Sequence, residues 1–165
     1  MRLFTAGHST VALDAFVGLM TDNGIDLAVD VRSKPRSRLP HFDQVPLEEA
    51  LGDVGVRYRF LGEKLGGMPQ DPRIAERWRQ GHLDPVIVAH LRGTEAWQEG
   101  IAELVRLVQH ADAAVCIVCS EGDPNECHRK AVALDAAEAL PGLEIVHLTV
   151  GRGTPREVGV QEVMM

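Results

Sequence analysis

The residues best suited to chemistry lie close together, in the stretch that runs from residue 119 to residue 129. This stretch contains Cys119, Glu121, Cys127, His128 and Arg129. A thiol near a helix N-terminus and an arginine can have a lowered pKa and act as a nucleophile. The acidic side chains beside Cys119 oppose the formation of a thiolate. Cys119 is therefore either a nucleophile or a thiol that is structural or lines a substrate site.

The flanking sequence places this stretch at the end of a strand. The apolar run Ala113–Val118 is short and β-branched, as is typical of a strand buried on both faces. Asp123 and Glu126 have the spacing of a capping box, and Pro124 suits the first helical position, so we expect a helix from Pro124. Cys127 would then face the core. In open α/β sheets ligands bind outside the carboxyl ends of strands, so we expect the functional site here.

Two earlier strands place further polar residues at the same edge. The apolar runs Arg2–Gly7 and Ile25–Val31 flank a helical pattern, which predicts a right-handed βαβ unit with parallel strands. His8 and Arg32 follow the ends of these strands, and Asp30 lies near the end of the second. We expect Asp30 to orient an arginine of the following loop, and Ser9 or Thr10 to cap the first helix, because Ser and Thr are good N-caps.

A cationic loop follows the second strand. In residues 32–38 four cationic side chains alternate with Ser and Pro, and the prolines exclude a regular helix or a central strand. The forked donors of arginine suit phosphate or carboxylate. Two interpretations are open: these arginines bind an anionic ligand, or they pair with the acidic residues of 121–126 and join the two loops.

The whole chain predicts an α/β fold with one domain. Its mostly parallel, Rossmann-like central sheet has helices on both faces, and it spans residues 1–150, with a C-terminal tail over 151–165. Trp97 marks the clearest helical stripe, from about residue 95 to 109. The polar sequence of residues 70–82 predicts a loop with a short helix. This loop is either a lid or an ordinary solvent-exposed loop.

Composition narrows the classes of protein. A chain of 165 residues with 45% apolar content suits one domain with a substantial core. No run approaches the ~20 apolar residues of a membrane span, and the N-terminus lacks the pattern of a signal peptide. We therefore expect no membrane partner and a cytoplasmic location, which the odd count of three cysteines also favours. The net charge of −7 argues against a broad polyanion-binding surface but permits a local basic pocket.

Four pieces of sequence occur together in a way that suggests a family. They are Thr5-Ala6-Gly7-His8-Ser9, Asp30-Val31-Arg32-Ser33-Lys34-Pro35-Arg36-Ser37-Arg38, Leu65-Gly66-Gly67, and Cys119-Ser120-Glu121 followed by Cys127-His128-Arg129. In this order they resemble the bacterial family catalogued as domain of unknown function 488, over about residues 3–150. The resemblance implies a compact α/β domain and no agreed activity.

The leading functional hypothesis is an enzyme or ligand-processing domain that acts on a small anionic compound, phosphorylated or nucleotide-like. It uses a pocket at the strand ends. The catalytic candidates are Cys119, Glu121 and His8, and the ligand-binding candidates are Asp30, Arg32, Arg36, Arg38, His128 and Arg129. The cofactor and the oligomeric state stay unknown.

Three alternatives are open. A nucleic-acid module would use the 32–38 loop to clamp phosphates. A redox switch would join Cys119 and Cys127. A metal site would use both thiols with His128 and His8, but the spacing differs from paired C-x₂-C blocks, and neighbouring Cys127 and His128 would diverge on a helix. We therefore assign no metal ligands from the sequence.

Overall fold

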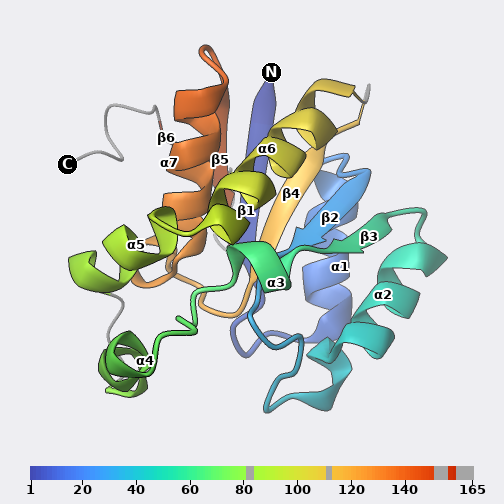
Figure 1. Ribbon diagram of the computed structural model, residues 1–165. Helices are drawn as coiled ribbons and strands as arrows, with labels where there is room; N and C mark the ends of the chain where they lie inside the picture. Colours follow the sequence, from blue (N-terminus) through green and yellow to red (C-terminus); the bar gives the residue numbers. More distant parts are fainter. Residues whose placement is uncertain (81–83, 111–112, 151–155, 159–165) are drawn as a thin grey trace.

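The computed structural model describes residues 1–80, 84–110, 113–150 and 156–158. Within these ranges a six-stranded sheet has the order β3-β2-β4-β1-β5-β6 (Figure 1). The first five strands pair in parallel and β6 is antiparallel to β5. The strands are β1 (Arg2–Gly7), β2 (Leu27–Asp30), β3 (Arg57–Phe60), β4 (Val115–Cys119), β5 (Glu144–Leu148) and β6 (Arg156–Val158). The structure confirms the predicted α/β class and mostly parallel sheet.

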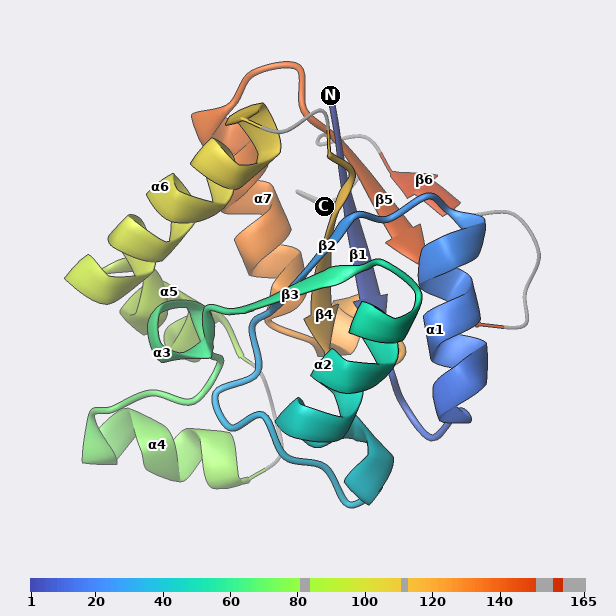
Figure 2. The ribbon, with the colours of Figure 1, turned by 90° about the vertical axis from the view of Figure 1, so that its right-hand side faces the viewer.

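Helices cover both faces of the sheet, as predicted (Figure 2). One face carries α1 (Leu13–Asp22) and α2 (Gln44–Asp53), and the other carries α5 (Pro85–Arg92), α6 (Glu95–His110) and α7 (Arg129–Ala139). The shorter helices α3 (Gly62–Leu65) and α4 (Pro72–Arg79) follow β3. No helix in the described ranges is long and apolar enough to cross a bilayer.

The sheet separates two hydrophobic cores. Along β4, Val115, Ile117 and Cys119 belong to the core beneath α6 and α7. Cys116 and Val118 belong to the core beneath α1 and α2. This alternation follows from the two-residue period of a strand, which sends successive side chains to opposite faces. Each polar side chain at the end of a strand therefore points to one face of the sheet or to the other.

The helix expected from Pro124 begins later, at Arg129. Residues Pro124–Glu126 form a single 3-10 turn, because the Asp123 carboxylate accepts a hydrogen bond from the Asn125 amide, two residues on. Cys127 then has extended backbone angles, φ −128° and ψ 138°, which interrupt the helix. Cys127 is buried as expected, but it precedes the helix and does not lie on its stripe.

Neither Ser9 nor Thr10 caps the first helix, which begins at Leu13 with Ala12 in the N-cap position. Ser9 has a φ of 46°, so the chain is still turning away from β1 at this residue. In the C-terminal tail, β6 pairs with β5. Residues 151–155 and 159–165 of the predicted tail lie outside the described residues, as do residues 81–82 of the predicted 70–82 loop. The division of the chain at residue 150 stays a prediction.

The end of β1 passes very close to the loop after β4. A Cβ atom placed on Gly7 would lie 1.6 Å from the Glu121 carbonyl oxygen and 2.9 Å from the Arg129 guanidinium. Real Cβ atoms never approach a backbone oxygen so closely, so only glycine allows this contact. Gly7 therefore sets the position of the loop that carries the reactive residues.

We predict that Gly7→Ala lowers the free energy of unfolding by about 3 kcal/mol, because the methyl group must displace backbone atoms. Gly18→Ala is the matched control, since a Cβ at Gly18 meets nothing within 4 Å in helix α1. The control should be neutral or stabilise the protein by up to about 1 kcal/mol through helix propensity. Urea unfolding followed by circular dichroism measures both. Equal stability of the two variants would contradict the tight contact at Gly7.

Candidate functional site

The predicted convergence at one sheet edge is present in the backbone. In the strand register Gly7 pairs with Cys119 and Asp30 pairs with Val118. The His8 amide donates to the Cys119 carbonyl at 3.0 Å. The carboxyl ends of β1, β2 and β4 therefore lie side by side, as the parallel topology requires.

The side chains nevertheless divide between the two faces. The His8 ring stacks on Phe42 with centroids 4.2 Å apart, and the Arg32 Nη1 donates to the Phe42 carbonyl at 2.7 Å. Phe42 belongs to the core beneath α1 and α2, whereas Cys119 faces α6 and α7. The structure thus differs from the expectation of one shared pocket, because residues one position apart along a strand point to opposite faces.

Asp30 and Arg32 form a buried ion pair, as expected from the sequence. The Arg32 Nη2 donates to the Asp30 Oδ2 at 2.7 Å, and the two side chains are 3% and 0% exposed. Burial disfavours the charged guanidinium, but the hydrogen bonds and charge of Asp30, together with Tyr58, outweigh burial and raise the Arg32 pKa. Tyr58 also donates a hydrogen bond to Asp30. Burial raises the Tyr58 pKa most, and the negative charge of Asp30 raises it further. Arg32 is satisfied within the chain, and its ligand-binding role stays a prediction.

His8 is buried with a defined tautomer. Its Nδ1 lies 2.9 Å from the Ser9 carbonyl oxygen, which can only accept, so Nδ1 donates. Burial lowers the His8 pKa and favours the neutral ring. The Nε2 lone pair of that ring is buried and has no hydrogen-bond partner within the described chain. The predicted catalytic role of His8 stays untested, and His8 does not share a face with Cys119.

Arg36 and Arg38 lie on the surface. Both side chains are exposed, and neither forms an ion pair with any residue that the structure describes. The described 32–38 loop is therefore not joined by ion pairs to the acidic residues of 121–126. Anion binding by Arg36 and Arg38 stays a prediction.

Arg129 is completely buried and holds the loop after β4 in place. Its Nη1 donates to the Glu121 carbonyl, its Nη2 donates to the Gly122 carbonyl at 3.0 Å, and its Nε donates to the Thr5 hydroxyl at 3.3 Å. Thr5 is a partner that sequence reasoning missed, although its inward position on β1 follows from strand alternation. These bonds give Arg129 a structural role, while its predicted ligand-binding role stays untested.

Two thiols and one imidazole converge beneath α6 and α7. Cys119 Sγ and Cys127 Sγ lie 3.8 Å and 4.0 Å from His128 Nδ1. All three donor atoms lie within 4.8 Å of one another, and all three residues are buried. The Cys119 Sγ also lies 3.7 Å from the Glu121 Oε2. Cys119, Glu121 and His128 are thus brought together as predicted, and Cys127 joins them.

The backbone directly after β2 sets the orientation of His128. Its Nε2 lies 2.9 Å from the Val31 carbonyl oxygen, which can only accept a hydrogen bond. Nε2 therefore carries a proton, and in the neutral ring the Nδ1 lone pair points toward the two thiols. A Cβ on Gly67 would lie 2.7 Å from the His128 ring, so the Leu65-Gly66-Gly67 piece lies in close contact with this histidine.

The group is strongly coupled electrostatically. Hydrogen bonding with Cys119 lowers the pKa of Cys127, and His128 and Arg129 act in the same direction. The same contact raises the pKa of Cys119. Burial opposes charge on His128, but Cys127, the Val31 carbonyl and the Glu121 charge together outweigh burial and raise the His128 pKa. Burial raises the Glu121 pKa. Within this group Cys127 is the thiol that most readily becomes a thiolate.

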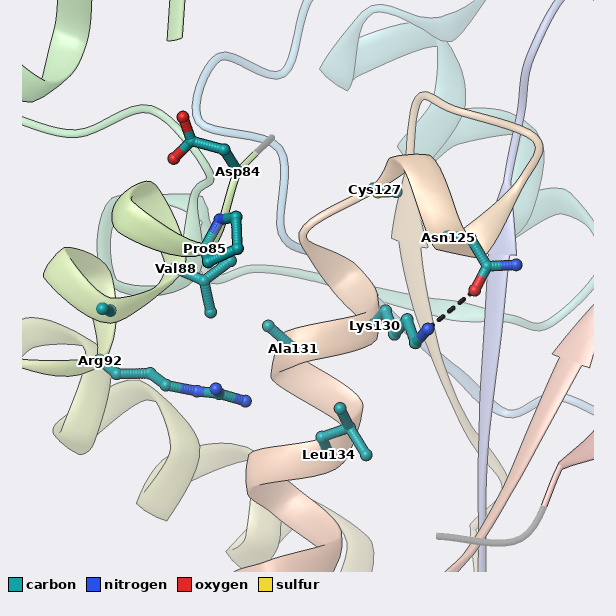
Figure 3. A pocket seen from close by; sticks show the side chains of 10 residues that line it. Asp84, Pro85, Val88, Arg92, Asn125, Cys127, Lys130, Ala131 and Leu134 are labelled. Carbon is teal, nitrogen blue, oxygen red and sulfur yellow. Dashed lines mark hydrogen bonds between the residues drawn. The ribbon is translucent and has the colours of Figure 1, made fainter. Parts of the chain in front are cut away.

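A cavity of about 420 Å³ adjoins this group between α5 and α7 (Figure 3). Cys127 contributes to its lining together with residues from both helices, including Val88, Arg92, Lys130 and Leu134. Sequence reasoning missed this cavity, because helix packing creates it and no local pattern marks it. Cys127 is the residue that belongs both to the thiol and imidazole group and to the cavity wall.

The fold and this site define a parallel α/β domain with a buried Cys, Cys and His group at the carboxyl end of its sheet. The chain belongs to the family described as domain of unknown function DUF488, whose family model matches residues 12–134. This confirms the resemblance seen in the sequence, although the Thr5 to Ser9 piece precedes the matched residues. No curated protein and no solved structure matches the chain.

We predict that Asp30→Asn lowers the free energy of unfolding by about 3 to 5 kcal/mol, because it leaves the buried Arg32 without a counter-ion. Glu76→Gln is the control, since Glu76 pairs with Arg79 on the exposed surface of α4. That change should alter stability by no more than about 0.5 kcal/mol. Denaturant unfolding measures both. A small effect of Asp30→Asn would show that Arg32 is free to serve a ligand.

Proposed function

We propose that this protein is a metal-dependent enzyme that binds Zn²⁺ through Cys119, Cys127 and His128. One observation carries the proposal: donor atoms from two separate segments converge in the interior, and the imidazole among them is oriented by a backbone carbonyl. Thiolate and imidazole are the ligands that Zn²⁺ prefers in proteins. Glu121 and Cys119 keep the catalytic importance predicted from the sequence, but Cys119 acts as a ligand.

The distances support a tetrahedral site. Zn–S bonds of about 2.3 Å and Zn–N bonds of about 2.0 Å place a sulfur and a nitrogen ligand about 3.5 Å apart. The two Sγ···Nδ1 distances of 3.8 and 4.0 Å exceed this by a few tenths of an ångström. Small side-chain rotations are sufficient to close that difference, so the fold needs no rearrangement.

The surroundings of His128 also support a metal. Histidine ligands commonly donate the second ring N–H to a carboxylate or a backbone carbonyl, which fixes the tautomer and makes the ligating nitrogen more basic. The Val31 carbonyl occupies that position, at 2.9 Å from Nε2. The adjacency of Cys127 and His128 is no obstacle, because Cys127 is extended and lies outside the helix.

Three protein ligands favour a catalytic centre over a structural one. Structural zinc sites are closed by four protein ligands, whereas catalytic sites keep one position for water or substrate. Among the described residues only three donors lie within 4.8 Å of one another. The Glu121 carboxylate lies 3.7 Å from Cys119 Sγ, and it would serve as the general base for a molecule bound at the metal.

Titration of metal-free protein with Co²⁺ tests the proposal. We expect one equivalent to bind and produce a thiolate-to-cobalt absorption band, and Zn²⁺ to displace it. Cys119→Ser, Cys127→Ser and His128→Gln should each weaken binding by at least about 100-fold, since even outer partners of a metal ligand contribute 10- to 100-fold. Cys116→Ser is the matched control, because Cys116 is a buried thiol on the opposite face of β4.

Two further measurements test the open position. Azide added to the Co²⁺ protein should shift its d–d absorption bands, because azide needs a vacant site. Glu121→Gln should retain the metal, because Glu121 is not among the three ligands. The metal site would be refuted if Co²⁺ did not bind stoichiometrically. It would also be refuted if Cys116→Ser and Cys127→Ser lowered the affinity for Co²⁺ equally. Loss of the metal in Glu121→Gln would instead mean a closed, four-ligand site and refute the catalytic role.

A further inference from the structure

We infer that the cavity between α5 and α7 binds a small ligand with an apolar body and a single anionic group, which Lys130 recognises. The further step, that such compounds are the substrates of the metal centre, rests on the proposed function. The anionic character agrees with the ligand class expected from the sequence. Its location differs, because the charge is recognised beside α7 and not by the 32–38 loop.

The cavity walls are apolar on both sides (Figure 3). Helix α5 contributes Pro85, Val88 and Ala89, and α7 contributes Ala131 and Leu134. A volume of about 420 Å³ lies within the range of cavities that hold small organic ligands. These five residues favour a compact hydrocarbon or aromatic body, because the polar groups of a sugar or a polyphosphate would find no hydrogen-bond partners among their side chains.

Charge balance selects the sign of the ligand. Arg92 is paired with Asp135 at 2.6 Å, and Asp84 is paired with Arg77 at 2.6 Å. Within the described chain, Lys130 has only a neutral partner, the Asn125 amide oxygen, at 2.8 Å from Nζ. Among the described lining residues, Lys130 therefore carries a positive charge without an anionic partner, and its ammonium group turns toward Asn125, which also lines the cavity (Figure 3). An anionic group that displaces the amide oxygen would form a charge-assisted hydrogen bond with Lys130.

Lys130 also stands next to the thiol and imidazole group. Its amide donates to the Cys127 carbonyl at 3.2 Å, so Lys130, in the first turn of α7, lies directly after the extended Cys127 backbone. A ligand whose anionic end reaches Lys130 is consequently held beside Cys127. Within the described chain, the cavity is tied to the reactive group because its apolar walls, a lysine with no anionic partner and one proposed metal ligand lie together.

A pair of related dyes tests the inference. 8-Anilinonaphthalene-1-sulfonate has an apolar body and one sulfonate, and N-phenyl-1-naphthylamine is the same body without the charge. Fluorescence titration of metal-free protein should show binding of the sulfonate dye that Lys130→Gln weakens roughly five- to tenfold, as expected for a hydrogen bond with a charged partner. Binding of the uncharged dye should not change. Ala89→Trp, which fills the cavity from an exposed position, should abolish binding of both.

Lys34→Gln is the charge-matched control, because Lys34 is an exposed lysine of the 32–38 loop. It should leave both dyes unaffected. Equal weakening by Lys34→Gln and Lys130→Gln, or unchanged sulfonate binding in Lys130→Gln, would overturn the inference. Because the dyes are measured without metal, the two proposals fail separately. Lys130-dependent binding in a protein that binds no Co²⁺ would support the cavity and refute only its link to a metal.

Discussion

The architecture of the site depends on the buried Arg129 guanidinium and the carbonyls that surround it. A buried cation is costly unless its donors are satisfied, and Arg129 is satisfied by loop carbonyls and Thr5 without a carboxylate. These bonds draw the loop after β4 onto the end of β1, where Gly7 leaves room for it. They also place positive charge beside Cys127 and contribute to its lowered pKa. One side chain thus sets both the shape and the charge of the site.

A second constraint is that the side chains of Asp30, Val31 and Arg32 point alternately to the two faces of the sheet. The two charged residues pair beneath α1 and α2, while the Val31 carbonyl reaches His128 on the other side of the sheet. The ion pair therefore fixes the backbone at the end of β2, where the Val31 carbonyl directly after the strand orients the imidazole. Ser33, the next residue, accepts a hydrogen bond from the Met68 amide, and Gly67 contacts the His128 ring. Segments that are far apart in the sequence therefore hold the His128 ring in position.

Periodicity and strand order were sufficient to predict the sheet, its two helical layers and the edge at which polar residues gather. They were not sufficient to predict which face each side chain occupies, because that depends on the register at the strand ends. His8 and Cys119 follow adjacent strands yet face different cores. The predicted start of α7 was also wrong, because Asp123 forms a local turn with Asn125 and not a capping box. The cavity depends on how α5 meets α7, which no local pattern encodes.

The late start of α7 is what allows neighbouring residues to serve one centre. On a regular helix, adjacent side chains diverge by about 100°, so Cys127 and His128 would point to different places. Here Cys127 is extended, with ψ 138°, and His128 is helical, with ψ −17°. This change of backbone conformation brings both side chains toward Cys119, while Arg129 turns toward the loop carbonyls. A cap at Asp123 that started the helix directly would separate the two donors. The short 3-10 turn therefore positions the two donor atoms of the site in addition to connecting β4 with α7.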